Sequence, residues 1–129
     1  MNRIRRHILI AMMVTLIGGA QIALPASPVF ASANGCIIPH GQFGCSTAPI
    51  PANQREHAIV ITAFPAVYSD VTCRAHDATN GIEVGSVTAR AGALWSSEKV
   101  IRGLYGKYFL SCLRRTKAAY QGGGTIGNG

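Results

Sequence analysis

Acidic residues are scarce in this sequence: 5 Asp and Glu stand against 12 Lys and Arg in 129 residues. Glycosidic cleavage needs two carboxyl groups that face one bond, and these acids are scattered along the chain, so such chemistry is disfavoured. The sequence also has no G-x-S-x-G segment, a local signature of serine hydrolases. A triad would need a serine, Asp70 or Asp77, and one of the histidines His40, His57 and His76, brought together from distant positions. We therefore expect a non-enzymatic protein, with a small secreted hydrolase or toxin-like enzyme as the alternative.

Motifs for cofactors and metals are equally sparse. Gly122, Gly124 and Gly127 match the spacing of the dinucleotide fingerprint, but that motif must precede a helix and only two residues follow it here. Cys73 and His76 have a spacing used by zinc ligands, yet on a strand these two positions face opposite sides. We expect no cofactor and no metal.

The N-terminus carries a basic stretch at residues 3–7 and an apolar run at residues 8–24, followed by two prolines and several small residues. This order predicts a secretory signal peptide, assigned to residues 1–33, with cleavage after Ala31 or Ala33. The alternative is a retained membrane anchor, because the run approaches the roughly 20 residues that span a bilayer. After cleavage no integral membrane span remains, and we expect the protein to be secreted or periplasmic.

Two special export routes are disfavoured. Arg5 and Arg6 resemble a twin-arginine signal, but no Ser or Thr precedes them and Ile8 stands where Phe is usual. Cys36 could be a lipoprotein acylation site, but the residues before it, 33–35, lack the expected Leu. General secretion is therefore the expected route.

The segment after residue 33 keeps nine Lys and Arg together with all five acids, for a net charge of +4. A moderately basic exported protein is expected to meet an anionic envelope polymer or an acidic protein partner, and no nucleic acid. The candidate contact residues surround the last predicted strand, interspersed with aromatic residues; they are Arg102, Lys107, Arg114, Arg115 and Lys117. The alternative is that these charges protect an edge strand from aggregation.

Four cysteines, Cys36, Cys45, Cys73 and Cys112, lie after the predicted signal peptide. An even number in a short exported chain predicts a disulfide framework, and four cysteines allow three pairings. We favour Cys36 with Cys45, which closes a short loop, and Cys73 with Cys112, which ties two strands. On the chain-entropy model these loops contribute about 3 and 4 kcal/mol. The crossed pairings stay open.

The rest of the chain has the pattern of short strands. Residues 57–64 form a β-branched apolar run, and residues 70–76 alternate apolar and polar side chains. An Asn-Gly pair then favours a tight hairpin. Within residues 82–91 the apolar positions change phase, which predicts a bulge at Gly85. A further strand is expected within residues 99–104, with a short turn of helix as the alternative.

The last convincing strand covers residues 105–115, with Tyr108, Leu110 and Cys112 on one face. No segment has the period of a long helix. We therefore divide the chain after the signal peptide into three parts: a loop-rich segment 34–56, a β-sandwich core 57–120 and a flexible glycine-rich tail 121–129.

The order of Cys73, Trp95 and a tyrosine-bearing strand with Cys112 resembles the immunoglobulin-like sandwich. The cysteines are 39 positions apart, closer than is usual in that fold, and Tyr108 precedes Cys112 by four residues instead of two. The resemblance implies a disulfide-tied sandwich and carries over no binding residue. The expected fold is all-β: a small antiparallel β-sandwich, immunoglobulin-like in outline, with two disulfides.

Two functions are compatible with such a fold. We expect a binding, inhibitory or envelope-structural module that acts through its basic and aromatic last strand. A subunit that exchanges a strand in a surface assembly is a further alternative, because open sheet edges permit strand addition.

Overall fold

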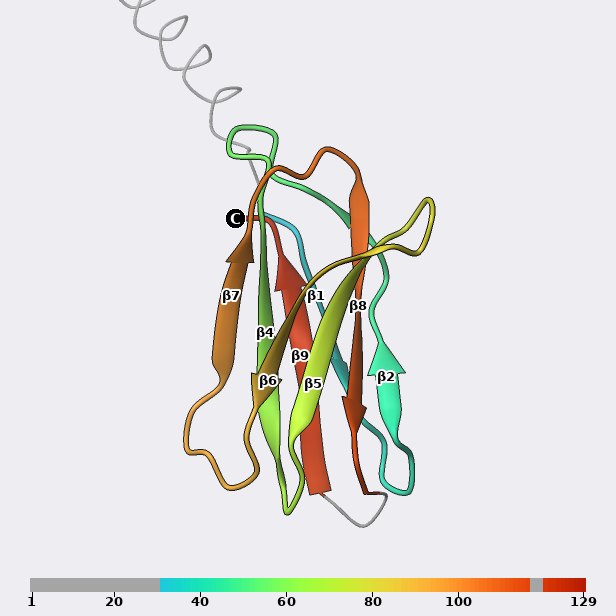
Figure 1. The fold of residues 1–129 in the computed structure, drawn as a ribbon, viewed down its shortest axis with the longest axis vertical. Coiled ribbons are helices and arrows are strands. Elements are labelled where there is room, and N and C mark those ends of the chain that lie inside the picture. The colour runs from blue at the N-terminus through green and yellow to red at the C-terminus, as the bar shows by residue number, and fades with distance from the viewer. Residues whose placement is uncertain (1–30, 117–119) are drawn as a thin grey trace, which may run out of the picture. The chain divides into compact units, whose positions relative to one another are not determined.

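The computed structural model of the protein describes residues 31–116 and 120–129. Within these residues nine strands form two antiparallel sheets that lie face to face (Figure 1). The predicted signal peptide, residues 1–33, falls almost wholly outside them. The strands are β1 (Ala33–Ile37), β2 (Gly44–Ser46), β3 (Ile50–Pro51), β4 (Ile59–Val67), β5 (Val71–Asp77), β6 (Glu83–Ala89), β7 (Ser97–Ile101), β8 (Lys107–Arg114) and β9 (Tyr120–Gly127).

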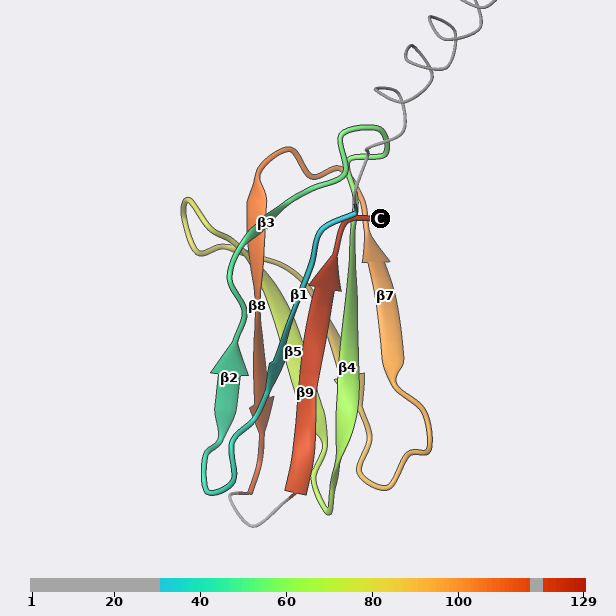
Figure 2. The same cartoon turned by 180° about the vertical axis from the view of Figure 1, so that it is seen from behind.

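The first sheet has the strand order β1-β9-β4-β7, and the second has the order β2-β8-β5-β6 with the short β3 also paired to β8. Figure 2 shows the first sheet from outside, with the last strand of the chain, β9, between β1 and β4. The predicted antiparallel sandwich with two disulfides is thus confirmed.

The core lies between the sheets and consists of side chains at alternate strand positions. On β5, Val71, Cys73 and Ala75 are fully buried, and on β8 Leu110 and Cys112 are as well. This is the two-residue period of a strand with one face against a core, as the sequence predicted for both segments. β4 contributes a third such row: Ile59, Ile61 and Ala63.

The segment 121–129, predicted to be a flexible tail, is instead the strand β9 at the centre of the first sheet. Its glycines are required by close packing. A Cβ atom added to Gly123 would collide with the carbonyl oxygen of Cys36, and one added to Gly124 would lie 2.6 Å from that of Thr62. The prediction was wrong because glycine weakens an isolated strand, whereas here it allows two neighbouring strands and the facing sheet to approach closely.

The segment 34–56, predicted to be loop-rich, contains β1, β2 and β3. These strands have two to five residues each, too few to show a periodic pattern. These segments form strands because they pair with strands elsewhere in the chain: β1 pairs with β9, and the other two pair with β8.

The strand after the hairpin has a bulge, as predicted, but at Val84 and not at Gly85. Ala75 pairs with Gly85 and the next residue, His76, pairs with Glu83, which leaves Val84 as the extra residue on β6. Val84 packs against the core, as predicted. Ile82 and Ala91, expected on the same face, are instead exposed, Ile82 to 62%.

The two disulfides have the favoured pairing, but they differ from those of an immunoglobulin-like domain. Cys36 and Cys45 join β1 to β2 and therefore link the two sheets. Cys73 and Cys112 are register partners on adjacent strands of the second sheet. Trp95 is 81% exposed instead of packing on a disulfide. The resemblance therefore extends to the two-sheet outline and not to the placement of the disulfide and the tryptophan.

Candidate functional site

Arg114, predicted to contact a ligand, is buried, with 3% of the residue exposed. Its guanidinium donates three hydrogen bonds to backbone carbonyls: Nε to Gln42 (3.0 Å), Nη1 to Gln121 (2.8 Å) and Nη2 to Pro39 (2.9 Å). A planar guanidinium suits such a divergent set of acceptors. Arg114 therefore ties the β1–β2 connection to β8 and β9, and its prediction as a surface contact is wrong.

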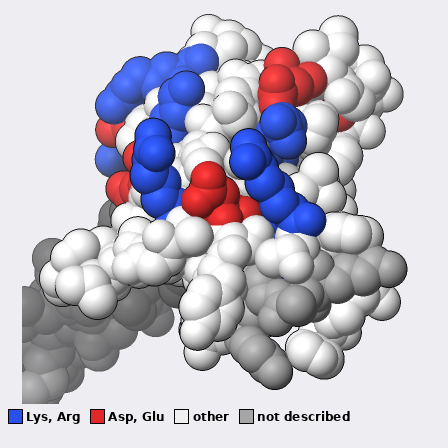
Figure 3. Space-filling model, turned by 60° about the horizontal axis from the view of Figure 1, so that its bottom comes forward, with Lys and Arg blue, Asp and Glu red and all other residues white. Residues whose placement is uncertain are grey.

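The other predicted contact residues do not form one patch. Lys107 begins β8 and Arg115 follows its last residue, which separates them by roughly 25 Å at a rise of about 3.3 Å per residue. Arg102 forms an exposed salt bridge with Glu56, with 3.7 Å between Nη1 and Oε2. Lys117 lies outside the described residues. Figure 3 accordingly shows Lys and Arg side chains in separate groups with acidic residues between them.

The connections that follow β1, β4, β6 and β8 gather at one end of the sandwich, which we call the loop end (Figures 1 and 2). The two ends of the described domain meet at the opposite end, where the Ser32 amide donates to Asn128 Oδ1 (2.6 Å). Loops held by a rigid scaffold are common positions for binding residues. The described loop-end segments are 38–43, 68–70, 90–96 and 115–116.

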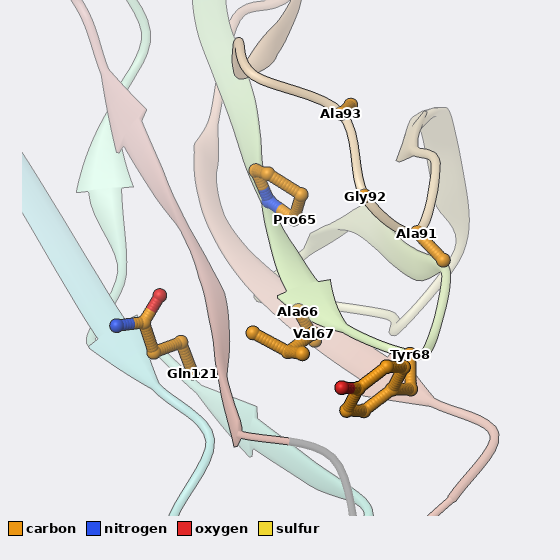
Figure 4. A pocket seen from close by; sticks show the side chains of 8 residues that line it. All are labelled: Pro65, Ala66, Val67, Tyr68, Ala91, Gly92, Ala93 and Gln121. Atoms are coloured by element: carbon orange, nitrogen blue, oxygen red, sulfur yellow. The ribbon is translucent and has the colours of Figure 1, made fainter.

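A groove of about 350 Å³ lies at the loop end, between the end of β4 and the 90–96 loop. Figure 4 shows residues 91–93 passing beside β4, with the Tyr68 ring near the end of that strand. The groove lining is mostly small or apolar: Pro65, Ala66, Val67, Tyr68, Ala91, Gly92, Ala93 and Gln121.

Three large side chains at the loop end are strongly exposed. The exposed fraction is 83% for Tyr68, 89% for Leu94 and 81% for Trp95. Tyr68 lines the groove, and Leu94 and Trp95 directly follow Ala93 of its opposite wall. We call these three residues the apolar tip.

A second concavity of about 330 Å³, the polar hollow, lies on the outer face of the second sheet next to the loop end. The Oγ1 atoms of Thr72 and Thr88, on adjacent strands, are 3.0 Å apart within its lining. The lining residues are Asp70, Thr72, Arg74, Thr88, Leu113, Arg114 and Arg115.

The polar hollow has a surplus of positive charge. Arg74 and Arg115 are both exposed, and Arg74 Nε also lies 3.0 Å from Oε1 of Glu83, outside the lining. Asp70 is the acid of the lining, and its Oδ1 accepts a hydrogen bond from the Ala91 amide (2.7 Å). One threonine hydroxyl donates to the other, so two guanidinium groups and one hydroxyl can donate to an anionic group placed between them.

Asp70 and Ala91 also connect the two concavities, because Asp70 lines the polar hollow and Ala91 lines the groove. The sequence placed Thr72 and Arg74 on the polar face of their strand. The sequence did not predict that these two residues share a concavity with Arg115, because that prediction requires the pairing of β5 with β8.

The histidines of the hydrolase alternative lie on separate elements. His57 precedes β4 and stacks on Tyr105, with 4.2 Å between ring centroids. His76 is on β5, where it stacks on Phe109 at 5.2 Å and its Nδ1 is 3.2 Å from the Gly81 oxygen. His40 is in the β1–β2 connection at the loop end. Enzymatic activity of this kind therefore stays an alternative hypothesis.

The potential metal ligands are cysteines. Within residues 31–116 and 120–129, the side chains of Cys36, Cys45 and Cys112 bring three ligand atoms within 4.8 Å of one another. All three belong to disulfides, and a disulfide sulfur is not the thiolate that binds zinc. Cys73 and His76 lie on opposite faces of β5, as the alternation predicted.

No protein-family model matches the chain, and a search of curated proteins found no match to it. None of the residues that the structure describes belongs to a helix long and apolar enough to cross a membrane. The function is therefore inferred from the geometry of the loop end and the polar hollow.

Proposed function

We propose that the protein is an exported, non-enzymatic binding module that holds an anionic envelope ligand in the polar hollow. The observation that carries this proposal is the convergence of Arg74, Arg115, Thr72 and Thr88 on one exposed concavity. Guanidinium groups donate strong, charge-assisted hydrogen bonds to phosphate or carboxylate oxygens, and the Thr72–Thr88 pair adds one neutral donor. The ligand is thus a phosphate or carboxylate group of an envelope polymer, or an acidic side chain of a protein.

Export is supported by two independent features. The N-terminal residues have the order of a signal peptide. The four cysteines form two disulfides, which persist in oxidising compartments such as the periplasm and the extracellular space.

The scaffold supports binding because it fixes the loops before a ligand arrives. Arg114 bonds to the β1–β2 connection on one side and to β9 on the other. The amide of Arg115 donates to Ser69 Oγ (3.0 Å), which fixes the start of the β8–β9 connection against the β4–β5 turn. Less conformational freedom then has to be lost on binding.

The test is retention of the intact exported protein on immobilised poly(glycerol phosphate) and on immobilised polyglutamate. The double variant Arg74→Gln/Arg115→Gln should weaken binding at least tenfold, because each charge-assisted hydrogen bond contributes about 1.5–3 kcal/mol. Added salt should also weaken polymer binding by the wild-type protein, because it screens the charges.

A matched control is Arg102→Gln/Lys107→Gln at the opposite end. It removes the same charge and also breaks one exposed salt bridge, as Arg74→Gln does. Its retention should stay within about twofold of the wild type, since exposed pairs contribute little. Equal losses in both double variants would show that net charge, and not the polar hollow, determines binding.

A further inference from the structure

The apolar tip is unusual in its composition and its position. Singly exposed apolar residues are ordinary on a protein surface, but Tyr68, Leu94 and Trp95 are gathered on two neighbouring loops at one end. Leu94 and Trp95 of the 90–96 loop do not belong to the core, because they are 89% and 81% exposed. Within residues 31–116 and 120–129 nothing buries these two side chains, which leaves them available to a partner.

Positive charge lies beside the tip. Arg90 begins the 90–96 loop and Arg115 follows β8 at the same end, and both side chains are exposed. Neither takes part in the two salt bridges formed among the described residues. A surface that complements this end must therefore combine negative charge with an apolar layer beneath it.

An anionic lipid bilayer has that combination. Trp and Tyr favour the membrane–water interface, where the ring is apolar on one side and polar at its tip. Arginine close to the surface is attracted to anionic headgroups. Leu94 supplies aliphatic area for the acyl boundary.

We propose that the loop end docks on an anionic bilayer surface, with Leu94 and Trp95 in the interface and Arg90 and Arg115 against headgroup phosphates. The inference rests on the proposed function at Arg115, which lines the polar hollow and here takes a lipid phosphate as its anionic group. The ends of the described domain lie at the opposite end of the sandwich (Figures 1 and 2), so docking leaves them pointing away from the bilayer.

Trp95 is the single tryptophan of the chain, so its fluorescence reports on the tip directly. The intact exported protein is titrated with vesicles of phosphatidylcholine alone and of phosphatidylcholine mixed with phosphatidylglycerol. The expected result is a blue shift of Trp95 emission with the anionic vesicles, little change with the neutral ones, and quenching by lipids brominated near the headgroup. High salt should reduce the shift.

Two variants test whether vesicles bind the apolar tip in particular or any exposed apolar side chain. Leu94→Ser should weaken vesicle binding about tenfold, because burial of a leucine side chain in the interface strengthens binding by about that factor or more. Ile82→Ser removes an exposed aliphatic side chain at the opposite end and should leave vesicle binding unchanged. Equal effects of the two variants would contradict docking through the tip.

The failures of the two proposals are distinguishable. If Trp95 emission does not shift with anionic vesicles while the soluble polymers are still retained through Arg74 and Arg115, lipid docking is wrong and the proposed function stands. If the emission shifts on adding an acidic protein but not vesicles, the tip is a protein interface and lipid docking is again wrong. If the wild-type protein is retained on neither polymer while its vesicle response persists, the proposed ligand site in the polar hollow is wrong.

Discussion

Gly124 of β9 lies directly against Cys112 of β8, because a Cβ atom added at position 124 would be 2.7 Å from the Cys112 Sγ. The same atom would lie 2.7 Å from the Cys73 Sγ and 2.6 Å from the Thr62 oxygen. The disulfide of the second sheet thus rests on a glycine of the first sheet. Covalently fixed sulfurs on one side and a paired strand on the other leave little room for a methyl group.

We predict that Gly124→Ala destabilises the protein by about 1–3 kcal/mol, the cost of overpacking a well-filled core. Urea unfolding measures the change. Gly127→Ala is the control on the same strand, because its added Cβ would meet nothing closer than 3.7 Å. That variant should stay within about 0.5 kcal/mol of the wild type. Similar losses at both positions would mean that strand propensity, and not contact with the disulfide, explains the glycine at 124.

Arg114→Lys should also destabilise the protein, although it keeps the positive charge. A lysine ammonium lacks the planar fork that reaches Gln42, Gln121 and Pro39. At least one of these part-buried hydrogen bonds would be lost, at a cost of about 1–3 kcal/mol. The neighbouring Arg115→Lys, at an exposed position, should be close to neutral in the same urea unfolding experiment. A neutral Arg114→Lys would show that the loops at this end hold their positions without it.

The sequence predicted those parts of the fold that depend on alternation along one strand. The buried rows of β5 and β8 follow directly from apolar residues two positions apart, and the disulfides follow from an even cysteine count with two core-facing members. Arg114 was misplaced although the same rule applied to it. It shares the parity of Leu110 and Cys112 and therefore faces inward; its charge outweighed that signal.

Features that depend on a partner strand were not predictable in this way. The glycines of β9 carry no hydrophobic pattern. Gly123 is explained by the close approach of Cys36, and Gly124 by the close approach of Thr62 and the second disulfide. The polar hollow likewise requires the register of β5 with β6 and β8, which places Thr72 opposite both Thr88 and Leu113. Neither pairing can be read from one strand alone.

The two disulfides should contribute unequally to stability. Their sequence separations are 9 and 39 residues, for which the chain-entropy model gives about 3 and 4 kcal/mol. Cys73→Ala/Cys112→Ala should cost more than Cys36→Ala/Cys45→Ala, since it also removes two fully buried sulfurs from the core. Urea unfolding of the two double variants checks the order, and peptide mapping without reduction checks the pairing. The reverse order would mean that the link between the sheets outweighs both loop length and core packing.

Deletion of residues 121–129 should abolish cooperative folding. The truncation removes β9, which pairs with both β1 and β4, and with it the fully buried side chain of Ile126. It also removes the Gln121 carbonyl that accepts from Arg114. We expect the losses of core burial, ladder hydrogen bonds and this acceptor together to exceed the about 5–15 kcal/mol by which small domains are stable.

Thermal unfolding followed by circular dichroism tests this prediction, with the deletion of Gly129 alone as the control for a shortened chain. The control should melt as the intact protein does, because Gly129 is exposed and lies beyond the end of β9. A cooperative transition in the protein that lacks residues 121–129 would show that the glycine-rich segment is dispensable, as its composition alone suggests. Loss of the cooperative transition would show that a glycine-rich strand holds the first sheet together, because backbone pairing on both edges adds to the few side-chain contacts that it makes.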